Sequence, residues 1–212
     1  MAFIDLSYPI DSDMITYCEK ERTNIYNLSS INTEGYNVKK LSITTHTSTH
    51  VDAPNHIIEN GLTIDKIPLD NFYGQGIIID CRNIKSQCID IDILNNYNLS
   101  NKDFILFYTG HDRYWGTVNY LSKYKYMSNK LCYYMSSLDI KGVGIDTISI
   151  DSESNITLNN HNKLLKNNKL IIENLANLNF LVNKSFELFL FPLKIQCGDG
   201  SPVRSVAKTY SL

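Results

Sequence analysis

The sequence lacks several features that would assign it to a specialised class of protein. No CxxC pair occurs and the five cysteines are odd in number, which fits free thiols in a reducing compartment better than a secreted disulfide framework. No apolar run approaches the length of about 18 residues that a membrane span needs. The N-terminus, MAFIDLSYPI, has no basic region followed by an apolar stretch, so it does not resemble a signal peptide. We expect a cytoplasmic protein.

An excess of basic charge is also missing. The net charge of −2 provides no positive surface that would attract nucleic acid or an anionic membrane. The chain shows no internal repeat, no long linker and no low-complexity tail, and its 212 residues suffice to bury a core. These absences predict a single domain over residues 1–212, with neither nucleic acid nor membrane as a partner.

Short segments rich in apolar and β-branched residues dominate the pattern along the chain. They predict strands at residues 1–10, 38–51, 76–81, 103–109, 142–150, 169–173 and 186–195. Short helices are expected between them, at residues 89–97, 119–126, 129–138 and 160–166. Residues 11–36 are polar and carry only weak turn signals. Strands interspersed with helices indicate an α/β or α+β domain built around a mixed sheet.

The segment THTSTHVDAPNH, residues 45–56, concentrates residues that can bind metals or move protons. It holds three of the five histidines and one aspartate: His46, His50, Asp52 and His56. The run of threonines opposes a helix, and on a strand these four residues, all of the same parity, would face one side. The four side chains are therefore expected to point to the same side, whereas the side chains of a random polar loop need not do so.

Reach limits what this segment can do if it is straight. An extended strand would separate His46 from His56 by about 33 Å, whereas a histidine nitrogen binds a metal at about 2 Å. We therefore expect the chain to bend near Ser48 and again at Pro54.

In the bent segment, two imidazoles and a carboxylate suit a divalent first-row metal. Three protein ligands, from His46, His50 and Asp52, would leave an open position for water, as in catalytic sites, with His56 beside it. The alternative is that two histidines at this spacing are ordinary surface or packing residues.

The same segment resembles the HxGTHxDxPxH signature of the metal-dependent cyclase family, which includes bacterial kynurenine formamidases. Ser48 stands where the family usually has glycine. Further segments resemble family motifs in the same order: DLSYPI, YTGHDRYWG, GVGIDTISID, KLIIENLANL and FPLKIQCGDGSPVRSVA. In the second of these, Tyr108 replaces the usual arginine. The resemblance runs nearly from end to end.

The resemblance implies an α/β fold of the swivelling β/β/α type, with a mixed sheet and flanking helices, assembled as a homodimer or homotetramer. It also implies two divalent metal ions, with zinc expected first and manganese also compatible. One ion would be held by His46, His50 and Asp52. Asp52 would bridge to the second, which His161 and Glu173 would complete. Without the resemblance, His161 and Glu173 would pass for ordinary surface residues.

The activity implied is hydrolysis of N-formyl-L-kynurenine to L-kynurenine and formate, with His56 as proton donor and acceptor. Tyr17 stands where formamidases carry a substrate-contacting tryptophan, and Cys18-Glu19 replaces the usual Pro-Gly, so the small-molecule substrate stays open. An aryl amide is expected first. The alternatives are a cyclic-amide substrate, as in isatin hydrolase, or a catalytically silent member that binds a metabolite.

Other polar residues each allow two interpretations. Asp146 and Asp151 either support metal ligands from behind or cap turns. His111 either lines the pocket or lies in an exposed loop. Asp199, between two glycines, favours turn chemistry over catalysis, and Cys197 has no identifiable activating partner.

Overall fold

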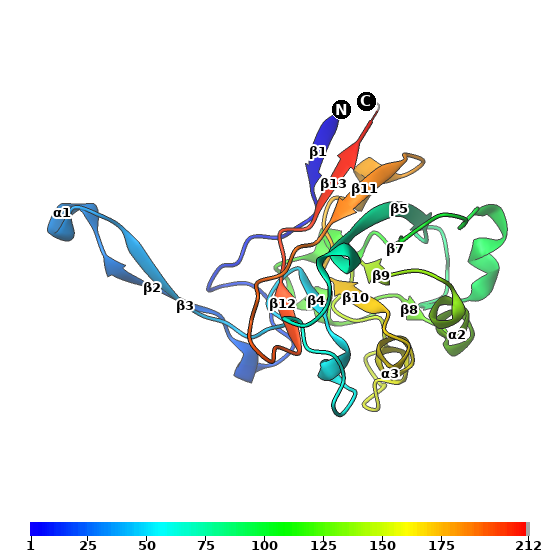
Figure 1. Cartoon of the computed structure of the whole chain (residues 1–212), viewed down its shortest axis with the longest axis horizontal. Helices are drawn as coiled ribbons and strands as arrows, with labels where there is room; N and C mark the ends of the chain where they lie inside the picture. Colours follow the sequence, from blue (N-terminus) through cyan, green and yellow to red (C-terminus); the bar gives the residue numbers. More distant parts are fainter. Residues whose placement is uncertain (211–212) are drawn as a thin grey trace.

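The computed structural model describes residues 1–210, and a nine-stranded mixed sheet is their framework. The strands lie in the order β1-β13-β11-β5-β7-β9-β10-β4-β12 and form a curled sheet (Figure 1). Its four central strands are parallel: β5 (Tyr73–Asp80), β7 (Phe104–Tyr108), β9 (Gly142–Ile145) and β10 (Leu170–Glu173). The flanking strands are antiparallel: β1 (Ala2–Asp5), β4 (His50–Asp52), β11 (Phe186–Phe189), β12 (Gly200–Pro202) and β13 (Val206–Thr209).

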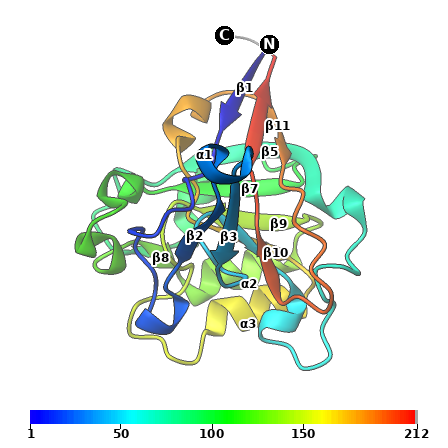
Figure 2. The same cartoon turned by 90° about the vertical axis from the view of Figure 1, so that its left-hand side faces the viewer.

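Both faces of the central strands are buried. On β7, Leu106 packs into one hydrophobic cluster, whereas Ile105 and Phe107 pack into a second cluster on the other side. This follows from the alternation of side chains along a strand, and it explains why β7 is a continuous apolar run. Two helices contribute to the second cluster (Figure 2): α2 (Asn129–Ser137) and α3 (Asn159–Lys166). The predicted α/β class is therefore confirmed.

The shorter elements connect this framework. β6 (Cys88–Ile89) and β8 (Tyr126–Met127) form a separate parallel pair. Short 3-10 helices of one or two turns occupy Glu19–Glu21, Pro54–His56, Leu69–Phe72, Ile91–Asn96, His111–Tyr114, Val118–Leu121 and Leu178–Leu181. Among residues 1–210 we find no helix with the length and apolar character needed to cross a bilayer.

Most predicted elements are present, but several expectations are wrong, and β12 and β13 lie where we expected no strand. The strand expected over 38–51 is two strands, β3 (Val38–Ser42) and β4, because the chain turns between them. The helix expected over 119–126 is only a 3-10 turn followed by β8. Residues 11–36, where we expected no element, contain β2 (Asn24–Ser29) and α1 (Ile31–Glu34).

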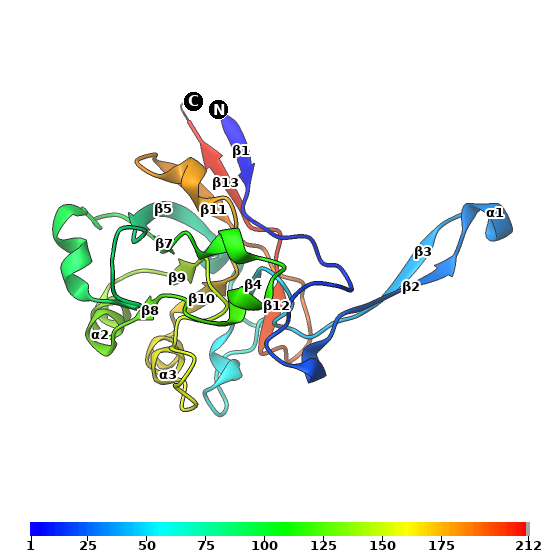
Figure 3. The ribbon, with the colours of Figure 1, turned by 180° about the vertical axis from the view of Figure 1, so that it is seen from behind.

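β2 and β3 form a hairpin, with α1 at its tip, that we call the arm, residues 24–42. It stands away from the rest of the molecule (Figures 1 and 3). Its apolar side chains are exposed, among them Tyr26, Leu28, Ile31 and Leu41. The sequence did not reveal β2 because no core faces it to impose an alternating pattern.

The close approach of β5 and β11 yields a prediction about stability. Phe186 lies opposite Gly76, and a Cβ on Gly76 would overlap the Phe186 ring. We expect Gly76→Ala to lower the free energy of unfolding by about 1–3 kcal/mol through overpacking, measured by urea denaturation. Phe186→Leu should relieve the overlap, so the double variant should be more stable than the sum of the two single changes by about 0.5 kcal/mol or more.

Phe189→Leu on the same strand is the matched control. Phe189 lies opposite Tyr73, not Gly76, so the changes in unfolding free energy caused by Phe189→Leu and Gly76→Ala should add. If the changes caused by Phe186→Leu and Gly76→Ala also added, this would contradict the packing described for β5 and β11.

Candidate metal and active site

The pairing of β4 with both of its neighbours assembles the centre of the site. Glu173 on β10 lies opposite His50, and Gly200 on β12 lies opposite Asp52. Residues directly opposite on antiparallel strands place their side chains on the same face, so Glu173 reaches His50 from far along the chain. Gly200 is needed because a Cβ there would come within 2.9 Å of the His46 ring.

The chain bends at both positions expected from reach. Ser48 has a φ of 58°, a left-handed conformation in which a side chain is strained. The Ser48 carbonyl accepts hydrogen bonds from Nδ1–H of His50 (2.9 Å) and from the side-chain amide of Asn174 (2.8 Å). This leaves Nε2 of His50 to face the carboxylates. The second bend is the 3-10 turn that begins at Pro54, and it brings the His56 ring to 4.1 Å from that of His46.

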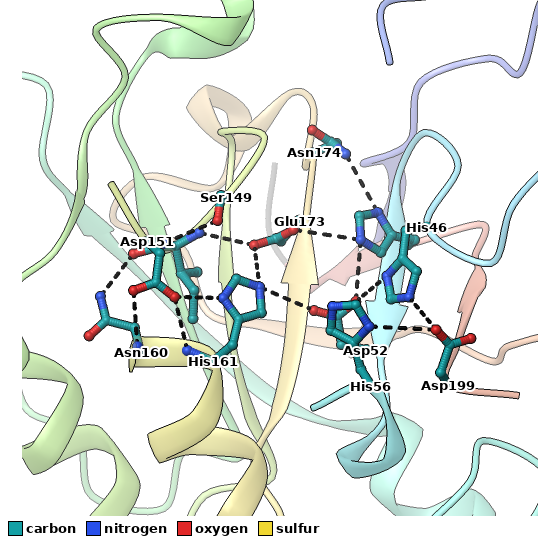
Figure 4. A network of polar contacts seen from close by, with 12 residues as sticks. His46, Asp52, His56, Ser149, Asp151, Asn160, His161, Glu173, Asn174 and Asp199 are labelled. Carbon is teal, nitrogen blue, oxygen red and sulfur yellow. Dashed lines mark hydrogen bonds and ion pairs between the residues drawn. The ribbon is translucent and has the colours of Figure 1, made fainter. Parts of the chain in front are cut away.

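Asp52 lies at the centre of a cluster of histidines and carboxylates (Figure 4), which we call the cluster. It is fully buried, and its two oxygens face different neighbours. Oδ1 is 2.8 Å from Nδ1 of His46 and 3.3 Å from Nε2 of His50. Oδ2 lies 3.6 Å from Nε2 of His161 and has no hydrogen-bond partner within residues 1–210. One carboxylate therefore connects two groups of donors.

His161 lies in the first turn of α3, and Asp151 orients its imidazole through hydrogen bonds on the side away from Glu173. The Asp151 carboxylate accepts hydrogen bonds from the backbone N–H groups of Asn160 and His161, at 2.9 and 3.1 Å, and from Nδ1–H of His161 at 2.7 Å. Nε2 of His161 then faces Glu173 Oε1 at 3.2 Å. His161 and Glu173 are both buried, so the surface interpretation of these two residues is wrong. Asp151 both caps the helix and orients the imidazole.

Asp199 belongs to the cluster, contrary to our expectation of turn chemistry alone. Its Oδ2 lies 3.0 Å from Nε2 of His46 and 3.5 Å from Nδ1 of His56, and Oδ1 accepts a hydrogen bond from Thr45 at 2.7 Å. Asp199 precedes β12, whose pairing with β4 carries it to the histidines. A prediction of strand β12 from the sequence would have indicated that Asp199 lies near the histidines, but we did not predict that strand.

The carboxylates control the protonation of the imidazoles. Burial opposes a charge on His46, but Asp52 and Asp199 outweigh that effect and raise the pKa of His46 to about 10. Burial likewise opposes a charge on His161, but Glu173 and Asp151 raise its pKa to about 10. Although burial favours the neutral acid, His46 and His50 hold the pKa of Asp52 below its usual value. The cluster thus attracts positive charge.

These residues fit a divalent cation. Ligand atoms of His46, His50 and Asp52 lie within 4.8 Å of one another, and so do those of Asp52, His56 and His161. A third such group joins His46, His56 and Asp199. The unpaired Oδ2 of Asp52 is a buried acceptor that a cation would satisfy. Metal binding displaces protons from imidazoles, so a cation would compete with protons at His46 and His161, whose pKa values the carboxylates raise.

A cavity of about 440 Å³ opens onto the cluster. His46, His50, His56, His161 and Glu173 line it together with Asp199. Its walls include four apolar side chains: Met14, Ile15, Ile148 and Leu158. Tyr17, the expected substrate contact, also lines the cavity and is 61% exposed.

The remaining candidates lie outside the cluster. The Asp146 carboxylate accepts hydrogen bonds from the backbone N–H groups of Thr109, Gly110 and His111, so it holds the turn after β7. His111 is buried and lines a different cavity. Cys197 is an exposed free thiol.

Taken together, the fold and this donor cluster define an α/β protein with a buried histidine–carboxylate site of the metal-binding type. The profile of the Cyclase family matches residues 4–152. The chain belongs to this family.

Relatives of similar sequence match between 82% and 97% of the chain. A kynurenine formamidase of Bacillus cereus is 30% identical over 209 residues, which is 97% of each chain. An uncharacterized protein of Methanocaldococcus jannaschii is 36% identical over 82% of this chain and 84% of its own. Among solved structures, isatin hydrolase A from Labrenzia aggregata bound to benzyl benzoate superposes with a TM-score of 0.87. It is 24% identical, with 99% of this chain and 94% of that chain covered, and it shows the shared fold.

Ser48 allows a test of the bend. Its side chain is buried and donates a hydrogen bond to the Tyr8 carbonyl at 3.1 Å. Ser48→Ala removes this bond and keeps the left-handed strain, whereas Ser48→Gly removes both. Relief of the strain is worth about 1 kcal/mol, so we expect Ser48→Gly to be more stable than Ser48→Ala by about that amount in thermal unfolding. Equal stability would contradict the left-handed conformation of Ser48.

Proposed function

We propose that this protein is a metal-dependent amide hydrolase of the arylformamidase type, which converts N-formyl-L-kynurenine and water into L-kynurenine and formate. The observation that carries the proposal is the position of buried Asp52, whose two oxygens face two separate groups of imidazoles that line a cavity. The kynurenine formamidases among its relatives support the choice of an aryl formamide.

We assign two divalent ions to this site, zinc first and manganese as the other compatible metal. His46, His50 and Asp52 would hold one ion, and Asp52, His161 and Glu173 would hold the other. When bound, such ions polarise an amide carbonyl and lower the pKa of water. A carboxylate shared between two cations offsets their repulsion, which suits the central position of Asp52.

His56 is the residue that we assign to proton transfer. It lies beside the donor groups, and an imidazole is a common general acid and base. Asp199, 3.5 Å from Nδ1, orients the ring. In the reaction, His56 accepts a proton from the attacking water, whose oxygen bonds to the formyl carbon. The C–N bond then breaks, and His56 delivers that proton to the departing aryl nitrogen.

Hydrolysis of a cyclic amide is the second candidate. A site for an open amino acid should offer partners for both an ammonium and a carboxylate group, whereas a lactam site should be smaller and more apolar. The cavity meets neither description in full, because Glu21 lines it but no lysine or arginine does, among the lining residues of the described chain. A catalytically silent member is disfavoured because a binding protein needs no proton carrier such as His56.

The proposal extends to the assembly and the compartment. We infer a homodimer or homotetramer, because a two-stranded hairpin is only marginally stable in water and the arm exposes apolar side chains that a second copy would cover. The five cysteines are free, which fits a reducing compartment such as the cytoplasm. We treat residues 1–212 as one hydrolase domain.

His56→Ala tests the assignment of proton transfer. We expect kcat for an aryl formamide to fall about 10²–10⁴-fold, with metal content and thermal stability retained because other residues bind the ions. The measurements are steady-state kinetics and elemental analysis of the purified holoenzyme.

His111→Gln is the control, because His111 is the one histidine outside the cluster, and it should retain turnover. Loss of metal from His56→Ala would show that His56 is a ligand and not a proton carrier. Bound metal without turnover of any aryl formamide or lactam by the unaltered protein would refute the hydrolase.

A further inference from the structure

The cavity above the cluster has an uneven distribution of charge. Three carboxylates line it: Glu21, Glu173 and Asp199. Glu173 and Asp199 contact imidazoles of the cluster, so these two carboxylates already have partners within the protein. Glu21 forms no salt bridge within residues 1–210, and the only hydrogen bond to its carboxylate comes from the Cys18 thiol at 3.6 Å.

The backbone places Glu21 in the cavity wall and not in open solvent. Residues Glu19–Glu21 form a 3-10 turn, which a hydrogen bond from the Glu21 N–H to the Cys18 carbonyl closes at 3.0 Å. The other two residues of this turn, Glu19 and Lys20, are exposed, whereas Glu21 is half-buried. The neighbouring Arg22 pairs with Glu19 at 3.5 Å, so it does not neutralise Glu21.

Resting on the proposed function, we propose that Glu21 binds an ammonium group on the side chain of the substrate and selects aryl amides that carry one. The apolar side chains of Met14, Ile15, Ile148 and Leu158 suit an aromatic ring, with the amide toward His56 and the charged substituent toward Glu21. A half-buried carboxylate without a cation is stabilised by such a group.

The same distribution of charge disfavours anionic substituents. A substrate carboxylate would meet no lysine or arginine among the lining residues of the described chain, and it would be repelled by Glu21. Substrates should therefore rank by charge, with an ammonium side chain best, a zwitterionic side chain next and a side chain that carries only a carboxylate last.

The test uses three 2-formamidophenyl ketones of matched size whose side chains end in an ammonium, a neutral alkyl or a carboxylate group. A hydrogen bond to a charged group is worth enough to change affinity about 10-fold or more. We expect Glu21→Gln in the holoenzyme to raise KM for the ammonium compound about 10-fold and to leave KM for the neutral compound unchanged. Glu21→Lys should favour the carboxylate compound.

Glu19→Gln is the matched control, because Glu19 lies on the same turn but its side chain is 87% exposed, and it should change none of the three KM values. Glu21→Asp keeps the charge and should restore part of the preference. Equal effects of Glu21→Gln on the ammonium and neutral compounds, or no effect, would overturn the inference and leave the formamidase proposal intact.

Failure of the proposed function gives a different pattern. If the unaltered protein hydrolyses none of the three formamides, calorimetric titration with the corresponding amine products still tests Glu21. Tighter binding of the ammonium-bearing amine, lost in Glu21→Gln and kept in Glu19→Gln, would support the inference. Equal binding of the charged and neutral amines would overturn it.

Discussion

The pairing of β4 between β10 and β12 is the constraint on which the rest of the site depends. It sets Glu173 opposite His50 and brings Asp199 beside His46. A slip of one residue in this pairing would turn His50 and Asp52 to the other face of the sheet. The left-handed turn at Ser48 then directs the imidazole of His50 through the bond that the Ser48 carbonyl accepts. Strand register thus determines which side chains can share a cation.

Several properties of the fold and of the candidate site could be predicted from the sequence. Apolar runs identified the central strands because both of their faces are buried, as in Phe104–Tyr108. The need for a bend between His46 and His56 followed from the length of an extended chain. The shared face of His50 and Asp52 followed from their parity on one strand, whereas His46 lies outside β4 and approaches them through the bend at Ser48. These features depend on residues that are close together in the sequence, so the pattern of a single sequence is enough to predict them.

Other properties depend on contacts between distant segments, so composition and spacing did not show them, and only the family resemblance pointed to His161 and Glu173. Glu173 and His161 become part of the cluster only through the pairing of β10 and the capping of α3 by Asp151. Asp199 looked like a turn residue because β12 is only three residues long. The arm was missed because its strands face no core. Glu21, in a polar stretch without periodicity, gained meaning only from the cavity that it lines.

We propose above that Asp52 would bind both of two metal ions, and metal content tests this most directly. The unaltered protein, freed of metal and then dialysed against zinc, should hold two ions per chain by elemental analysis, and manganese should compete for the same positions. Asp52→Asn should lose metal from both positions, whereas Asp70→Asn, at an exposed carboxylate, should keep both. Full occupancy of two ions in Asp52→Asn would contradict the account.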